Sequence, residues 1–256
     1  MFNHLSVASA FSFKYGTTQP HDLVARAAQF GAPALAITDR DSLAGVIRFV
    51  QAAKDFGIAP IVGVNLALDN SRVTLLAQSG TGTDSGWRSL CRLMSALRPD
   101  RNPPNLHLEK IKTLSEYTSN LILLHGPDSQ IANLITKHRP DQALHEFNKY
   151  RPYFADSVIE CVSHLAPGDG PRSTGHAGRM LGFARDHDLP AVITNGVRML
   201  DAADGPVADI LDAARKLVPL HKRHVERANN EAYLKDNQQM RDLADEISRA
   251  AGERSG

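Results

Sequence analysis

Short apolar runs alternate with amphipathic segments along most of the chain. Apolar side chains that recur at helical spacing predict helices, and short continuous apolar runs predict buried strands. The predicted strands are residues 34–38, 58–63, 73–77, 120–124, 157–161 and 190–194. The predicted helices are residues 18–31, 42–57, 87–96, 129–137, 176–187 and 202–214, with a last one at about 236–251. Helices and strands that alternate through short links predict an α/β fold with a parallel sheet.

Several polar segments separate these elements. Pro20 suits the first turn of a helix, and Asp41 or Ser42 is placed to cap the helix after the first strand. Residues 166–174 form a loop rich in Gly and Pro. No linker divides the chain, so one α/β barrel explains the pattern better than two domains. Periodicity alone would equally allow an open doubly wound sheet.

Composition places the chain among ordinary globular proteins. It has 256 residues, of which 42% are hydrophobic and 22% charged, and a formal net charge of +1. Since there is no overall basic excess, any nucleic-acid contact would have to be local. The two cysteines, Cys91 and Cys161, form no CxxC pair or zinc spacing, which favours a reducing, cytoplasmic location. We find neither a signal peptide nor a membrane-spanning run.

The ends of the predicted strands carry the candidate chemistry, because α/β barrels place their reactive groups there. The residues at these ends are Ser6, Ala8, Asp39, Arg40, Asn65, His125, Glu160, His164, Asn195, Gly196 and Arg198. Asp39, His125, Glu160 and His164 could ligate a metal. Arginine cannot, because it stays protonated and offers no free lone pair.

Four segments of the chain resemble the motifs of one known family. These segments are residues 4–13, 35–40, 61–65 and 195–198. In order, spacing and strand context they are similar to the PHP (polymerase and histidinol phosphatase) domain at the N-terminus of bacterial DNA polymerase III alpha subunits. The resemblance extends to residues 232–235 and the following helix, and is loose between residues 65 and 155. It implies a distorted seven-stranded (β/α) barrel.

The family's motifs read His-x-His, Thr-Asp-His, a glutamate after an Ile-x-Gly strand, and Asn-Asp-Val-His. The positions where this chain departs from them are Ser6, Ala8, Arg40, Asn65, Gly196 and Arg198. Asp39 and His164 match retained ligands. The resemblance therefore implies a vestigial pocket made of Ser6, Ala8, Asp39, Arg40, Asn65, Glu160, His164, Asn195, Gly196 and Arg198.

No cofactor is expected in this segment. The alternative is Mn or Zn held by some of Asp39, His125, Glu160 and His164, whereas the Mg of the parent polymerase belongs to other domains. Arginine stands at two former ligand positions, which suggests that guanidinium groups have replaced cations. We therefore expect Arg40 and Arg198 to pair with Asp39 and Glu160.

Three functions remain open. The first is a catalytically inactive PHP domain of a DNA polymerase III alpha subunit, in replication or error-prone repair synthesis, which supports the fold and binds partners. The second is a metal-dependent phosphoesterase or 3′–5′ exonuclease. The third is a non-catalytic nucleic-acid-binding module, with Arg40, Arg198, Lys222 and Arg223 as its basic patch.

The first function defines the expected organisation and partners. Residues 1–235 form the PHP-like domain, and residues 236–256 form a helix and a frayed tail that lead into polymerase domains. The expected partners are those domains, a proofreading or accessory replication subunit, and DNA bound through the parent polymerase. No membrane partner is expected.

Overall fold

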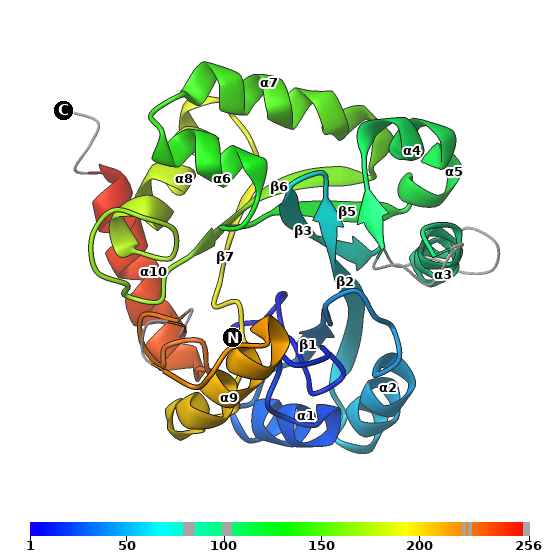
Figure 1. The fold of residues 1–256 in the computed structure, drawn as a ribbon, viewed down its shortest axis with the longest axis vertical. Helices are drawn as coiled ribbons and strands as arrows, with labels where there is room; N and C mark the ends of the chain where they lie inside the picture. The colour runs from blue at the N-terminus through cyan, green and yellow to red at the C-terminus, as the bar shows by residue number, and fades with distance from the viewer. Residues whose placement is uncertain (79–84, 99–103, 222–223, 225–226, 253–256) are drawn as a thin grey trace.

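The computed structural model describes residues 1–78, 85–98, 104–221, 224 and 227–252. A curled sheet lies at the centre and helices surround it (Figure 1). Lys222 and Arg223 of the expected basic patch lie outside the described residues. No helix in the described part of the chain is long and apolar enough to cross a membrane.

The sheet has seven strands. They are β1 Ala34–Ile37, β2 Ala59–Leu68, β3 Ser71–Ala77, β4 Asn105–Leu106, β5 Leu121–His125, β6 Asp156–Val162 and β7 Ala191–Thr194. The strand order is β1-β2-β3-β5-β6-β7, and the short β4 pairs with β2. Strand pairs β1/β2, β5/β6 and β6/β7 are parallel, whereas β3 runs antiparallel to β2 and to β5.

The N-terminal segment joins the two ends of this sheet. Its side toward β1 is held by hydrogen bonds from Thr38 N to Val7 O (2.7 Å) and from Ala36 N to His4 O (2.9 Å). Its other side pairs with the segment after β7, where Ala8 N donates to Val197 O (2.8 Å). The prediction of a distorted (β/α) barrel is therefore confirmed, and the closing segment carries the first candidate motif.

Helices cover the outside of the barrel (Figure 1). They are α1 Pro20–Gln29, α2 Val46–Asp55, α3 Gly86–Ala96, α4 Leu108–Thr113, α5 Ser115–Thr118, α6 Gln130–Thr136, α7 Pro140–Tyr150, α8 Thr174–Asp186, α9 Gly205–Lys216 and α10 Asn237–Gly252, with short 3-10 turns η2 Arg151–Tyr153 and η3 Ala202–Asp204. Their buried faces are aliphatic and aromatic, as amphipathic periodicity requires.

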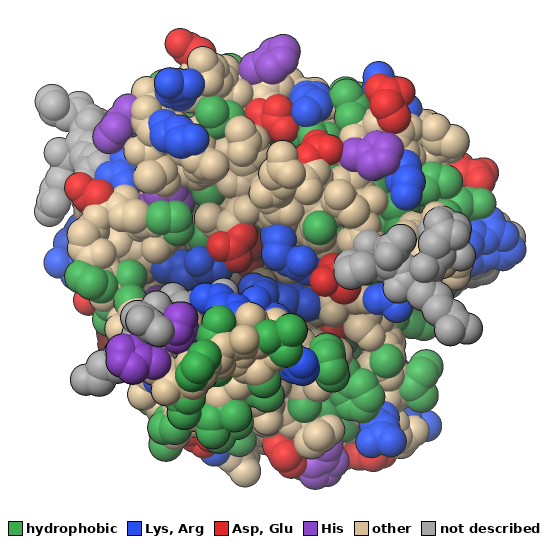
Figure 2. Space-filling model, viewed as in Figure 1, with side chains coloured by type: hydrophobic (Ala, Val, Ile, Leu, Met, Phe, Trp, Pro, Cys, Tyr) green, Lys and Arg blue, Asp and Glu red, His purple; other side chains and the backbone are tan. Residues whose placement is uncertain are grey.

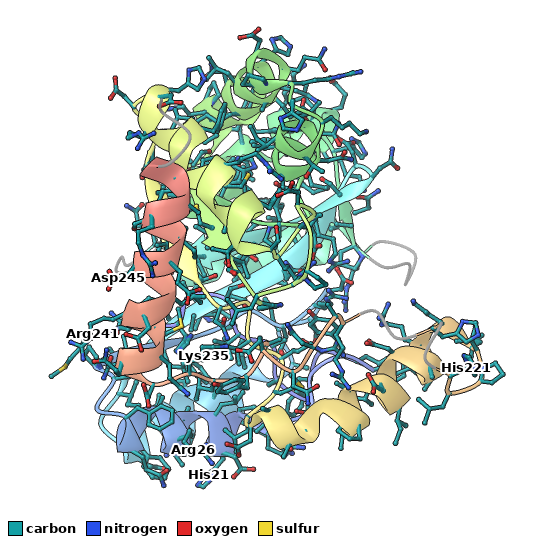
Figure 3. The ribbon with its side chains drawn as sticks, turned by 90° about the vertical axis from the view of Figure 1, so that its left-hand side faces the viewer. His21, Arg26, His221, Lys235, Arg241 and Asp245 are labelled. Carbon is teal, nitrogen blue, oxygen red and sulfur yellow. The ribbon has the colours of Figure 1, made fainter. Side chains whose placement is uncertain are left out.

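Helix α10 packs against the barrel. Met240, Leu243 and Ile247 lie against Ala177 of α8, and a Cβ added to Gly178 would touch the α10 backbone. Figure 3 shows Arg241 and Asp245 on the outer side of α10 and Lys235 at its inner end. The Lys235 carbonyl accepts a hydrogen bond from His4 Nε2 (2.9 Å). The last helix is therefore tied to the barrel, while a domain boundary at residue 235 stays a prediction.

The expectation of a wholly parallel sheet is wrong at β3. Only Asp69 and Asn70 separate β2 from β3, and Asp69 has a φ of 51°. A two-residue connection can only turn the chain back into an antiparallel hairpin, and Asp and Asn favour such turns. The Asp-Asn pair was therefore an available signal.

The expected start of the second helix is also wrong. Helix α2 begins at Val46 after Gly45, rather than at a cap formed by Asp41 or Ser42. Asp41 has a φ of 55° and accepts a hydrogen bond from Arg72 (2.9 Å), so its carboxylate serves the strand ends. The sequence reading also omitted α4, α5 and α7, which lie largely in the region where the family motifs match loosely.

Candidate functional site

A cleft opens at the carboxyl ends of the strands. Figure 2 shows Lys and Arg side chains gathered in a hollow across the middle of this face. Its inner and outer pockets share Tyr15, Arg40, Arg72, Asp128 and Arg172. The outer pocket has a volume of about 370 Å³. Six arginines line it: Arg40, Arg72, Arg172, Arg198, Arg215 and Arg227. We call the two pockets together the arginine cleft.

Most of the candidate residues converge on this cleft. Those that line the inner pocket are Ser6, Ala8, Arg40, Asn65, Glu160 and Gly196. His164 and Arg198 line the outer pocket. Asp39, His125 and Asn195 are buried and line neither pocket. The fold thus gathers residues from strand ends that are far apart in the sequence, although not all reach the cleft surface.

Asp39 is held by hydroxyl and amide groups rather than by a cation. Its carboxylate accepts hydrogen bonds from Ser9 N (2.6 Å), Ser9 Oγ (2.9 Å) and Ser12 Oγ (2.8 Å). Burial raises the pKa of Asp39, and the bonds from Ser12 and Ser9 only partly offset that rise. These contacts use both carboxylate oxygens within the fold.

Glu160 is buried at the end of β6. Its carboxylate accepts a hydrogen bond from the Oγ1 of Thr194 (2.6 Å), and Thr194 is the last residue of β7. Burial raises the pKa of Glu160, against the opposing effect of hydrogen bonds from Thr194 and Ser6. Gly126 lies so close to Glu160 that an added Cβ would clash with the carboxylate. Both strand-end carboxylates therefore accept their hydrogen bonds from groups that carry no charge.

The two candidate histidines are uncharged. His164 Nε2 donates to the carbonyl of Asn195 (2.6 Å), and burial lowers its pKa to about 3. His125 is buried with its ring 5.4 Å from that of Phe147, and burial lowers its pKa to about 3 as well. His125 Nε2 has no hydrogen-bond partner among the described residues.

These donors do not form a metal site. In the part of the chain that the structure describes, no group of three or more His, Cys, Asp or Glu residues is arranged to hold a metal ion. The oxygens of Asp39 are taken up by serines and the Nε2 of His164 by a carbonyl. A Mn or Zn centre needs several convergent anionic or imidazole donors, so the residues do not fit one.

Arg198 forms a buried ion pair with a residue that the sequence reading did not name. Its two terminal nitrogens donate to the carboxylate of Asp212 in α9 (3.1 and 3.0 Å), and one also donates to the Tyr15 carbonyl (3.0 Å). Arg215 donates to the same carboxylate (2.9 Å). Burial alone would raise the pKa of Asp212, but the two arginines hold it below its usual value.

The Arg40 guanidinium contacts an aromatic ring, whereas that of Arg198 pairs with a carboxylate. The Arg40 guanidinium lies 3.3 Å from the centre of the Tyr15 ring. Among the described residues, charged groups act on it only at longer range, without a hydrogen bond. Desolvation lowers the pKa of Arg40, and the charges of Arg72 and Arg215 lower it further. The prediction that Arg40 and Arg198 pair with Asp39 and Glu160 is therefore wrong, because aromatic stacking and Asp212 take that place.

The sequence reading missed most of the cleft's other charged groups. Arg72 donates to the Asn65 side chain (2.7 Å) and to its carbonyl (2.8 Å), and Arg172 donates to Asp128 (2.6 Å). Recognising the β2–β3 hairpin would have predicted Arg72, because Thr74 pairs with Asn65 and Arg72 lies on the same face of β3. Arg172 stands in the Gly- and Pro-rich loop, which gave no such signal.

Comparisons with known proteins agree with this fold. The family model described as "PHP domain" matches residues 4–164. The chain is 34% identical over 261 residues to an error-prone DNA polymerase of Symbiobacterium thermophilum, covering 93% of this chain and 23% of the relative. It is 31% identical over 268 residues to a DNA polymerase III subunit alpha of Buchnera aphidicola, covering 97% of this chain and 22% of the relative.

The chain therefore spans less than a quarter of the length of these two relatives. A solved structure from Bifidobacterium adolescentis, described as a metal-dependent phosphoesterase, aligns with a TM-score of 0.45 at 15% identity, over 95% of this chain and 96% of that chain. Since the family model matches well over half of the residues, the chain belongs to the PHP domain family.

Proposed function

We propose that this chain is the N-terminal PHP module of a bacterial DNA polymerase, and that it acts in replication or error-prone repair synthesis without catalysing a reaction itself. The observation that carries the proposal is the cleft, where the positions that depart from the family's motifs hold Arg40, Arg198 and small or amide side chains. Similarity to the N-terminal part of much longer polymerases supports the same conclusion.

The contacts of the described residues support a role without hydrolysis. Metal-dependent phosphoester cleavage needs cations to polarise the phosphoryl group and to lower the pKa of the attacking water. Here the retained carboxylates, Asp39 and Glu160, are bound by serine and threonine hydroxyls, and Arg40 would repel a divalent cation. A phosphoesterase or 3′–5′ exonuclease activity is therefore the weaker alternative.

As a module, the barrel would support the polymerase and bind other proteins. Its partners in this proposal are the remaining polymerase domains, a proofreading or accessory replication subunit, and DNA through the parent enzyme, all in the cytoplasm. Polymerisation itself, with its Mg ions, would belong to domains outside this chain. Residues 1–235 would form the PHP module, and residues 236–256 would lead onward.

An antibody raised against the folded chain tests this proposal. It should precipitate from the source cells a protein about four to five times as long as this chain, in line with the 23% and 22% shares of the relatives. The precipitate should extend a primed DNA template in the presence of Mg and deoxynucleotides. Recovery of a 27.9 kDa protein alone, with no primer extension, would contradict the proposal.

A further inference from the structure

Helix α9 turns its charged side toward the barrel and its apolar side toward solvent. The Asp212 carboxylate is buried against Arg198, and the Asp209 carboxylate pairs with Arg227 (2.7 Å). The exposed residues of η3, α9 and the helix cap are instead almost all apolar. They are Ala202, Ala203, Pro206, Val207, Ile210, Ala214, Lys216 and Leu217. A surface helix normally has the opposite arrangement, with its apolar side buried.

Helix α10 shows that normal arrangement. Its apolar residues Met240, Leu243 and Ile247 are buried against α8, and its outer side carries Arg241 and Asp245 (Figure 3). The same view shows α9 extending away from the sheet toward His221. Since two helices of one fold differ in the side that is covered, the exposed apolar side of α9 requires an explanation of its own.

The apolar side chains of α9 form one stripe. Val207, Ile210 and Leu217 recur at helical spacing, so they lie on one face, and they are 47%, 55% and 86% exposed. Figure 2 shows hydrophobic side chains over the region where Figure 1 places α9. Contiguous apolar surface of this kind marks an interaction site, whereas scattered apolar side chains do not.

Phe13 extends this stripe near the C-terminal end of α9. Its side chain is 78% exposed, and the Nζ of the next residue, Lys14, donates to the Ala214 carbonyl of α9 (3.1 Å). The loop that carries Phe13 is therefore attached to the helix. We define the α9 patch as Phe13, Val207, Ile210, Ala214 and Leu217.

The charge on the Phe13 side of the α9 patch is positive. Lys14 contacts a carbonyl and the Phe13 ring, and the Arg48 guanidinium lies 5.5 Å from the Phe11 ring. Each of these cations thus contacts uncharged groups, whereas Asp209 of α9 is paired within the fold. A protein that covers the patch can complement this border with Asp or Glu side chains.

An acidic amphipathic helix matches both features. Its apolar stripe would cover the α9 patch, and its Asp and Glu side chains would lie beside Lys14 and Arg48. We propose that the α9 patch is a docking surface for an acidic amphipathic helix from outside residues 1–256. This proposal rests on α9 and its border, and it does not depend on the chain's being part of a polymerase.

Two other occupants match the surface less well. A second copy of this chain would bring a second set of the same cations to the interface. A membrane surface binds helices whose polar side is rich in Lys and Arg, whereas the acidic and basic groups of α9 include Asp209 and Asp212, which form ion pairs within the fold. Each of these occupants gives a distinct result in the test.

The experiment is photo-crosslinking in the source cells. The full-length protein carries a photoreactive amino acid at position 210, or at position 241 on the outer side of α10 as the matched control. We expect a crosslinked product from position 210 and none from position 241. Mass spectrometry of the linked peptide should identify a segment with apolar residues at helical spacing and Asp or Glu beside them.

The linked segment, made as a synthetic peptide, is then titrated against the purified chain. We expect Ile210→Glu to weaken binding about tenfold or more and Lys14→Gln about threefold. The matched control Ser248→Glu, at an exposed position of α10, should leave binding unchanged. Thermal unfolding of each variant without peptide checks that it is folded.

Several results would overturn the proposal. They are the absence of a product from position 210, equal products from both positions, and a linked peptide that belongs to residues 1–256 or lacks acidic residues. Equal weakening of peptide binding by Ile210→Glu and Ser248→Glu would have the same meaning. Sedimentation of the purified chain with vesicles of phosphatidylcholine and phosphatidylserine, abolished by Ile210→Glu, would identify a lipid surface as the occupant instead.

Discussion

The two sides of the arginine cleft neutralise their buried carboxylates by different means. At the strand ends, Asp39 is surrounded by serine hydroxyls and an amide, and burial raises its pKa. Across the cleft, Asp212 of α9 lies between Arg198 and Arg215, which lower its pKa. The charge of Arg198 is thus balanced by a helix outside the strand-end motifs. The arginines of this cleft therefore do not pair with Asp39 or Glu160, the acids at the strand ends.

Removing the charge of Asp212 should give the largest effect. Asp212→Asn leaves the buried Arg198 without its anionic partner, so we expect it to lower the free energy of unfolding by about 3–5 kcal/mol. Urea unfolding at neutral pH measures this. The control is Asp201→Asn, which breaks a half-exposed pair with Arg26 and should cost less than about 1 kcal/mol. An equal loss of unfolding free energy in the two variants would show that the buried Asp212 pair is no more important for stability than an exposed ion pair.

The strand-end side should instead lose stability through protonation. The pKa of His125 is about 3 in the folded state, against an ordinary value of 6.5, so the unfolded chain binds the extra proton between these values. The stability that depends on an uncharged His125 is therefore fully present above pH 6.5 and is lost progressively as the pH falls toward 3.

The variant His125→Leu tests this pH dependence. Its free energy of unfolding should fall by about 2 kcal/mol less than that of the parent between pH 7 and pH 5. The control Leu123→Val, at a buried apolar neighbour on β5, should lose the same amount of stability at both pH values. If the free energy of unfolding falls equally in the parent chain and in His125→Leu between pH 7 and pH 5, His125 is not held uncharged.

Asp39 should tolerate the substitution that Asp212 does not. In Asp39→Asn the amide oxygen can still accept from Ser9 N and Ser12 Oγ, and the amide nitrogen can donate to Ser9 Oγ. We expect a loss of about 1 kcal/mol by urea unfolding, well below that of Asp212→Asn. A loss as large as that of Asp212→Asn would mean that the Asp39 charge is needed.

Arg40→Gln should have the smallest effect on the ligand-free protein. The variant loses the stacking on Tyr15 but is relieved of repulsion from Arg72 and Arg215. We expect its free energy of unfolding to change by less than about 1 kcal/mol. The loss in Arg198→Gln should be several times larger, because that variant removes the guanidinium that pairs with the buried Asp212 carboxylate. A large loss in Arg40→Gln would give Arg40 a structural role.

The barrel and the residues at its strand ends could be predicted from the sequence, because both depend on the local pattern of apolar and polar residues. Apolar runs predicted every strand of the sheet except β4, and Arg40, Asn65 and Glu160 lie at or close to the ends of those runs. The antiparallel course of β3 was missed although its Asp-Asn turn was visible. These features are encoded within a few neighbouring residues.

The partners of the arginines could not be predicted in the same way. Asp212 reaches Arg198 because α9 is packed beside the segment after β7, and no local pattern states where a helix will dock. Tyr15 comes from the loop after the first motif, and its ring contacts both Arg40 and Arg198 only in the folded barrel. Tertiary placement, rather than residue type, decides which carboxylate balances which guanidinium.

The central claim is that this PHP domain has replaced its metal centre by hydrogen bonds and arginine pairs. The most direct test is the metal content of the purified chain after exposure to manganese and zinc and removal of the excess ion. We predict less than about a tenth of an equivalent, since no group of three or more His, Cys, Asp or Glu side chains among the described residues is arranged to hold a metal ion. Two or more tightly held equivalents would contradict the account.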